Sequence, residues 1–127
     1  MNTKNWTTRP SSQTLGNLPW WKKQFHEVCP HGLEIFLVNG THVRNVHDSD
    51  FCQGGHEFAY DFIPAGEIWV DDITPPAELP FVVFHECFER EKMMKGMSYS
   101  KAHDLAKALE DRERARVRPG EPLNDEP

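Results

Sequence analysis

Residues 66–95 read GEIWVDDITPPAELPFVVFHECFEREKMMK, and the strand and helix expected within them organise the rest of the chain. Residues 66–72 alternate apolar and polar side chains with a period of two, which predicts a β-strand. Two prolines then interrupt the strand, and Pro80 stands where the first residue of a helix is expected. Residues 81–95 continue that helix, and Gly96 is its expected C-cap.

A second helix is expected directly after the first. Ser98 is a favourable N-cap residue. An apolar stripe follows at helical spacing, made of Ala102, Leu105, Ala106 and Leu109. Pro119-Gly120 and the acidic end of the chain cannot continue a helix, so this one is expected to end near Val117.

The sequence before residue 66 is richer in β-forming residues. Residues 33–38 (LEIFLV) predict a strand, and Asn39-Gly40 is a strong hairpin-turn signal, so residues 41–46 are the expected return strand. A loop centred on Gly54-Gly55 then leads to an expected strand over 57–63 and a turn over 64–66.

The segment from Leu18 to Pro30 has Trp21, Phe25 and Val28 near helical spacing, which predicts a short first helix. Together these elements indicate the α+β class, with a small antiparallel sheet followed by two packed helices. Residues 18–118 form a single expected domain. The polar residues 1–17 and the acidic residues 119–127 are predicted to be disordered.

Composition excludes several classes of protein. The formal net charge is -6, whereas a nucleic-acid binder needs a dominant basic surface. Three cysteines without a CxxC spacing fit neither a disulfide scaffold nor a four-cysteine zinc module. The N-terminus has no apolar secretory core, and no apolar run approaches the ~20 residues of a membrane span. We therefore expect a cytoplasmic protein without nucleic-acid or membrane partners.

The helix after Pro80 combines buried character with charge. Its first two turns are apolar on nearly every side, yet His85, Glu86 and Glu89 lie in their midst. A buried carboxylate is costly unless it has a partner, and no Lys or Arg precedes Arg90 in this helix. A bound cation resolves this conflict.

The spacing of these residues fits such a cation. Residues i and i+4 share a helix face, so His85 and Glu89 can reach the same metal ion. Glu86, next to His85, would lie beside the ion, where a general base acting on a water molecule belongs. We therefore expect zinc or another divalent first-row metal, with Glu86 as the catalytic residue.

The segment GEIWVDD, a break and then FVVFHECFE resembles the zincin metallopeptidases, and in particular the compact phage-associated zincins of the ImmA/IrrE type. Their helix carries HExxH, and Glu89 takes the place of the second histidine here, giving HExxE. Residues 40–113 also resemble short uncharacterised phage proteins. The resemblance implies a minimal zincin-like fold.

In zincins a further ligand comes from the following helix, and the resemblance makes His103 the candidate. Glu110, two turns further on, would orient a ligating imidazole or replace His103 as a ligand. His56, after two glycines, and Tyr99 are candidates for contacts with the substrate or for stabilising an oxyanion. Simple packing or surface roles remain open for all of these residues.

Two functions from different classes follow. The first is a small metal-dependent hydrolase that cuts a peptide or other amide bond. The second is a non-catalytic, phage-type interaction protein with a structural metal or none, whose partner would be another protein. A third interpretation takes His103-Asp104 as the HD pair of a phosphohydrolase, but that fold is all-helical and the first half of this chain is rich in β-forming residues.

Overall fold

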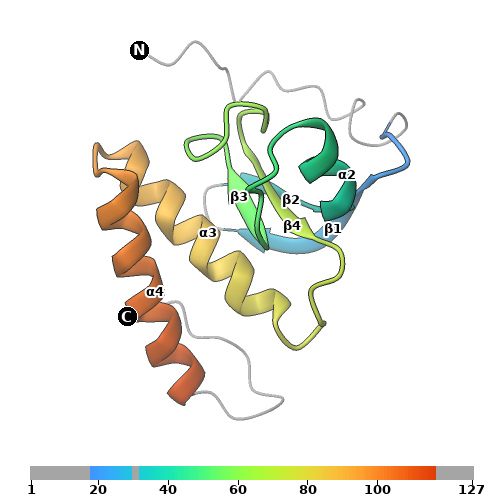
Figure 1. Ribbon diagram of the computed structural model, residues 1–127. Coiled ribbons are helices and arrows are strands. Elements are labelled where there is room, and N and C mark those ends of the chain that lie inside the picture. Colours follow the sequence, from blue (N-terminus) through green and yellow to red (C-terminus); the bar gives the residue numbers. More distant parts are fainter. Residues whose placement is uncertain (1–17, 30–31, 117–127) are drawn as a thin grey trace.

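Four strands form one sheet, and helices cover both of its faces (Figure 1). The computed structural model describes residues 18–29 and 32–116, so the predicted disordered segments 1–17 and 119–127 lie outside the described residues. In chain order the elements are β1 (Lys22–Cys29), β2 (Leu33–Val38), α2 (Gly40–Val46), β3 (Gly54–His56), β4 (Glu67–Asp71), α3 (Leu79–Met94) and α4 (Tyr99–Arg116).

The sheet has the strand order β1-β2-β4-β3. β1 pairs with β2 and β3 pairs with β4 in antiparallel fashion, whereas β2 and β4 are parallel. The α+β class with two packed helices is confirmed. The sheet itself is mixed rather than antiparallel, because the chain between β2 and β4 crosses over and returns in the same direction.

Each face of the sheet has its own core. On one face, side chains of β2 and β4 pack against Val82 and Val83 of α3. On the other face, Phe36, Val38 and Trp69 pack with Val43 of α2 and with residues of the neighbouring loops. β4 is therefore buried on both sides, although its sequence alternates as a half-exposed strand does.

The predicted helix over residues 18–30 is wrong, because residues 22–29 form strand β1. Its backbone pairs with β2, with Phe25 opposite Ile35. Trp21 and Phe25 do have helical spacing, but pairing with an adjacent apolar strand outweighs such a local preference.

The predicted hairpin at Asn39-Gly40 is also wrong. Asn39 instead caps helix α2: its side-chain oxygen accepts a hydrogen bond from the His42 backbone N–H at 2.9 Å. The Gly40 N–H donates to Asp71 Oδ1 at 3.2 Å, and a Cβ at Gly40 would collide with this carboxylate. Asparagine suits both a turn and an N-cap, so Asn-Gly alone did not distinguish them.

The third strand lies earlier than expected. β3 is the segment Gly54–His56, whereas residues 57–63, predicted as a strand, form turns. The first turn closes with hydrogen bonds from the Ala59 and Tyr60 N–H groups to the His56 carbonyl, at 3.1 and 3.0 Å. These local hydrogen bonds replace the strand pairing that the alternating sequence indicated. The predicted strand over 66–72 is confirmed as β4.

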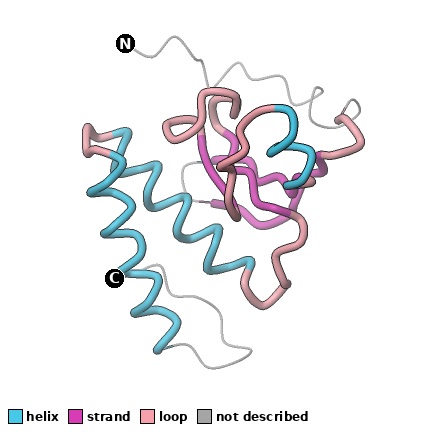
Figure 2. The backbone as a smooth tube through the Cα atoms, viewed as in Figure 1, coloured by secondary structure: helices cyan, strands magenta, loops and turns pink. Residues whose placement is uncertain are grey.

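The two predicted helices are confirmed as α3 and α4, and Figure 2 shows them as two long helical segments joined by a short loop. Pro80 lies in the first turn of α3, Gly96 follows its end with a φ of 102°, and Ser98 Oγ accepts from the Lys101 N–H at 3.3 Å. α3 lies between α4 and the sheet (Figure 1). The predicted end near Val117 lies outside the described residues.

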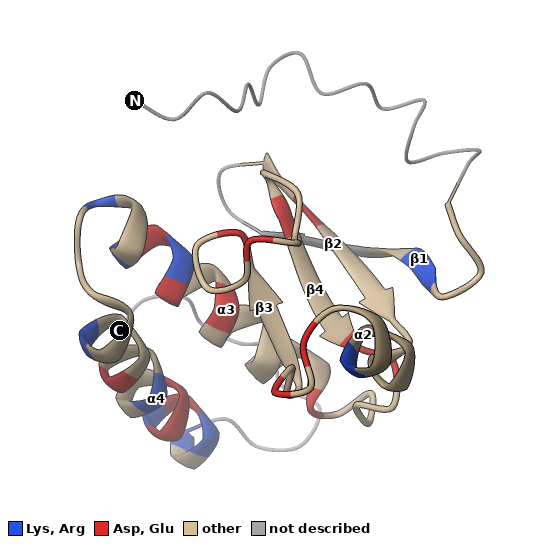
Figure 3. Cartoon of the chain, turned by 45° about the horizontal axis from the view of Figure 1, so that its top comes forward, with Lys and Arg blue, Asp and Glu red and all other residues tan. Residues whose placement is uncertain are grey.

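Charges alternate along α4, where acidic and basic segments follow one another (Figure 3). Arg114 and Arg116 pair with Glu110 and Glu113 on the same helix, so α4 carries no continuous basic face.

Within the described residues, no helix combines the length and apolar character that crossing a bilayer requires. Cys52 is an exposed free thiol, whereas Cys87 is disulfide-bonded, contrary to the expectation from the odd cysteine count. The cytoplasmic location stays a prediction.

Candidate metal centre

The HExxE residues lie on the buried sides of α3. His85, Glu86 and Glu89 are 7%, 8% and 2% exposed. α3 is enclosed by the sheet on one side and α4 on the other, so residues one turn apart point into the same interior region. The structure therefore places two carboxylates and an imidazole in the interior.

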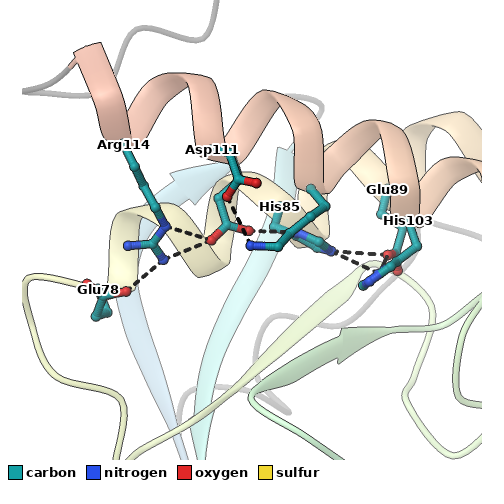
Figure 4. Close-up of polar contacts among 8 residues, drawn as sticks. Glu78, His85, Glu89, His103, Asp111 and Arg114 are labelled. Atoms are coloured by element: carbon teal, nitrogen blue, oxygen red, sulfur yellow. Dashed lines mark hydrogen bonds and ion pairs between the residues drawn. The ribbon is translucent and has the colours of Figure 1, made fainter.

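His103 of α4 completes a triangle of donor atoms with two of these residues (Figure 4). His85 Nε2 lies 3.2 Å from Glu89 Oε2 and 3.3 Å from His103 Nδ1. His103 Nδ1 lies 2.9 Å from the same Glu89 oxygen. The two nitrogens and one carboxylate oxygen converge on one point between α3 and α4.

The size of this triangle fits a metal ion. Ligand atoms about 2.0–2.2 Å from a tetrahedral zinc ion lie roughly 3.3 Å or slightly more from one another. Two imidazole nitrogens at this separation also need either a shared proton or a cation that accepts both lone pairs. The arrangement of His85, Glu89 and His103 can therefore hold a divalent cation and leaves a fourth position for another ligand.

Glu110 determines which nitrogen of His85 faces the triangle. Its Oε1 atom lies 2.9 Å from His85 Nδ1. A carboxylate accepts hydrogen bonds, so His85 Nδ1 carries a proton, and Nε2 is the nitrogen that faces Glu89 and His103 and could bind a metal ion. Arg114 holds the other Glu110 oxygen from Nε at 2.9 Å and also pairs with Glu78 at 2.7 Å (Figure 4).

His56 of β3 orients Glu89 in a similar way. Its Nε2 atom lies 2.8 Å from Glu89 Oε1, and its Nδ1 atom accepts the Phe58 backbone N–H at 3.2 Å. Because Nδ1 accepts, the proton of the neutral ring is on Nε2, which donates it to Glu89. Glu89 thus has one oxygen bound by His56 and the other directed toward His85 and His103.

His56 also forms a second cluster of donor atoms with Glu86 and Glu89. The hydrogen bond from Phe58 argues against a metal there, because the ring nitrogen that faces the carboxylates already carries the proton. We therefore assign His56 to the orientation of Glu89, and the triangle on α3 and α4 is the better metal centre.

The charge balance of the site favours a cation. Burial lowers the pKa of His85, but the hydrogen bond to Glu89 and the nearby Glu86 and Glu110 carboxylates raise it to about 9. Burial raises the pKa of Glu89, and hydrogen bonds from His56, His85 and His103 lower it to about 2. The surrounding carboxylates thus favour positive charge at His85, and a metal ion would supply that charge in place of a proton.

Glu86 lies beside the triangle and differs from the other carboxylates. Burial, followed by repulsion from Glu89, raises its pKa to about 8. Its stem packs near β3, where a Cβ at Gly54 would lie 3.4 Å from Glu86 Cγ and 2.8 Å from the Trp69 carbonyl oxygen. Glycine at position 54 therefore lets strand and helix approach closely enough to hold Glu86 in place.

A cleft of about 340 Å³ opens onto the site. Glu86, the triangle residues and Glu110 line it from α3 and α4, and Tyr60 lines it from the loop after β3. Tyr99, the first residue of α4, also lines it, and its ring stacks on that of His103 at 5.4 Å between centroids. The cleft thus adjoins both Glu86 and the triangle.

The structure brings together all the candidate site residues that the sequence indicated. Glu110 contacts the outer nitrogen of His85 and is not among the three residues of the triangle, so its position suits the orientation of His85. Asp104 is exposed, contrary to what an HD pair would require. Tyr60 was not among the residues predicted from the sequence, because a single tyrosine in a loop belongs to no recognisable pattern. The closest signal was its position four residues after His56.

Comparison with protein-family models, with curated proteins and with solved structures found no significant match to this chain.

Proposed function

We propose that this protein is a zinc-dependent hydrolase of the zincin type that cleaves a peptide or another amide bond. The main support is the carboxylate of Glu86, which is buried on α3 beside three converging donor atoms and lines a cleft. The strand, break and helix of residues 66–95 add to it, because they are the segment that resembles zincins.

The donor set agrees with this function. Two imidazole nitrogens and one carboxylate oxygen with an open fourth position are typical of catalytic zinc. A bound zinc ion would lower the pKa of a water molecule and polarise the substrate carbonyl. The same donor set also binds ferrous iron, but Glu86 favours hydrolysis, because hydrolysis needs a base that accepts a proton from water.

Glu86 has a chemical role in the proposed reaction, whereas Glu110 and His56 have orienting roles. The Glu86 carboxylate takes a proton from the attacking water as its oxygen bonds to the carbonyl carbon. It then delivers this proton to the amide nitrogen as the carbon–nitrogen bond breaks, and so returns to its ionised form. Glu110 and His56 keep His85 and Glu89 oriented throughout.

Peptide hydrolysis by the zinc-loaded full chain tests this proposal. A mixture of internally quenched peptides with randomised sequence should be cleaved, and mass spectrometry identifies the bond. Glu86→Gln keeps the shape of the side chain and should lower kcat by several orders of magnitude with zinc still bound. Glu91→Gln, which removes a carboxylate paired with Lys95 at the C-terminal end of α3, is the matched control and should keep full activity.

Wild type and Glu86→Gln acting alike on every peptide would contradict a catalytic role. The protein would then be the non-catalytic interaction protein, with its metal in a structural role.

A further inference from the structure

Tyr60 is held rigidly at the cleft by its surroundings. Its ring packs against Phe51 and Phe62, with centroids 5.5 and 5.3 Å away. Its edge lies on the backbone of β3, where a Cβ at Gly55 would be 2.5 Å from the ring. The Tyr60 backbone is fixed as well, because its N–H donates to the His56 carbonyl and its carbonyl accepts from the Ile63 N–H.

The Tyr60 side chain shares the cleft with Glu86. Burial and, to a smaller extent, the nearby Glu86 carboxylate raise the pKa of its phenol to about 12, against a smaller lowering by a backbone hydrogen bond from Cys52. The phenol therefore keeps its proton at neutral pH and can donate a hydrogen bond into the cleft.

Tyr99, the other phenol of the cleft, is held less tightly. It is 48% exposed and is the first residue of α4, and its ring packs on that of His103. A donor stabilises developing charge best when it is already fixed in place, since no energy is then spent on ordering it during the reaction. Of the two phenols, Tyr60 meets this condition.

We propose that Tyr60 donates a hydrogen bond to the substrate carbonyl oxygen as negative charge develops on it, and is thus a catalytic residue opposite the helix that carries Glu86. The inference rests on the proposed hydrolase function, whose transition state has that charge. It also predicts that the cleft binds a tetrahedral oxyanion whether or not a peptide is cleaved.

Binding of a phosphinic pseudodipeptide (Ala-Ala type) to the zinc-loaded full chain tests this role without requiring turnover. Titration calorimetry should show that Tyr60→Phe lowers the affinity for the phosphinate at least tenfold. A well-placed oxyanion donor contributes about 10²–10³-fold to the rate of a reaction, so its loss should also weaken binding of an oxyanion analogue. Imidazole, which offers no anionic oxygen, is the control ligand, and its affinity should be unchanged. Tyr60→Phe keeps the ring, so the packing against Phe51 and Phe62 remains.

Gly55→Ala provides an independent variant. It keeps the Tyr60 hydroxyl but displaces the ring, so it should also lower the affinity for the phosphinate. Thermal unfolding checks that the variant is folded. Unchanged phosphinate affinity in Tyr60→Phe, or no phosphinate binding by the wild type at millimolar concentration, would overturn the role of Tyr60. A larger loss in Tyr99→Phe would also overturn it. If phosphinate binding depends on Tyr60 but no peptide is cleaved, the hydrolase function fails while the oxyanion site stands.

Discussion

The carboxylate of Glu110 accepts a hydrogen bond from Nδ1 of His85 at 2.9 Å across the interface between α3 and α4. This contact keeps a proton on His85 Nδ1 and directs Nε2 toward Glu89 and His103. Metal-ligating histidines commonly have such a carboxylate at their other ring nitrogen, and here the contact links the candidate metal site to the packing of the two helices.

Glu110→Gln should lower zinc affinity by about 10–100-fold although all three ligands remain, because a neutral amide supports the His85 imidazole less well. Competition with a fluorescent zinc chelator measures this change. Asp111→Asn, at the neighbouring exposed position where the carboxylate pairs with Lys107, is the matched control and should leave the affinity unaltered. Equal affinities in the two variants would argue against support of His85 by Glu110.

His103→Ala should weaken zinc binding at least tenfold, whereas Asp104→Asn should change it little. The reason is that His103 Nδ1 lies 2.9 Å from Glu89 while Asp104 is exposed. An HD-type site uses both residues, so loss of metal from Asp104→Asn alone would mean that α4 is turned differently about its axis. The same chelator competition distinguishes these outcomes.

His56→Ala should weaken zinc binding and also destabilise the metal-free protein by about 1–3 kcal/mol. It leaves one oxygen of the buried Glu89 without its hydrogen-bond donor. Urea unfolding in the presence of a chelator measures the stability. His47→Ala, which removes an exposed histidine, is the control and should have a smaller effect. A stability loss no greater in His56→Ala than in His47→Ala would contradict the described role of His56.

Glu86 should make the stability of the metal-free protein depend on pH. Its folded pKa is raised by burial from 4.5 to about 8, so folding takes up a proton between these values and stability is lost as pH rises through that window. Glu86→Gln removes this loss. The variant should therefore be more stable than the wild type at pH 9, by up to a few kcal/mol. This difference in the free energy of unfolding should become smaller toward pH 4. Urea unfolding of both proteins at pH 9 and pH 4 measures this difference. A difference in stability that does not change with pH would contradict the burial of an ionisable Glu86.

The second half of the fold was predictable because its signals are local. Pro80, Gly96 and Ser98 act within one turn of their own position, so each marks a helix end wherever the rest of the chain lies. The HExxE spacing likewise defines one face of α3 without any knowledge of the sheet. These features therefore predicted the pair of helices α3 and α4 and the candidate metal site on α3.

The first half was harder to predict because distant contacts determine it. β1 is a strand because β2 pairs with it, and α2 begins at Gly40 because the Asp71 carboxylate, 31 residues away, receives its N–H. His56 and Tyr60 reach the site through the turn after β3. No spacing rule connects them to α3, so their roles could be assigned only once the strand and helix were placed together.

Metal content of the untagged protein tests the central claim most directly. Purified without a histidine tag and analysed by elemental mass spectrometry, the wild type should carry about one zinc, or another first-row metal, per chain. His85→Ala should carry none, and Glu89→Ala should carry much less than the wild type. A wild type that binds no metal even after incubation with zinc, or full occupancy in His85→Ala, would contradict the metal centre described here.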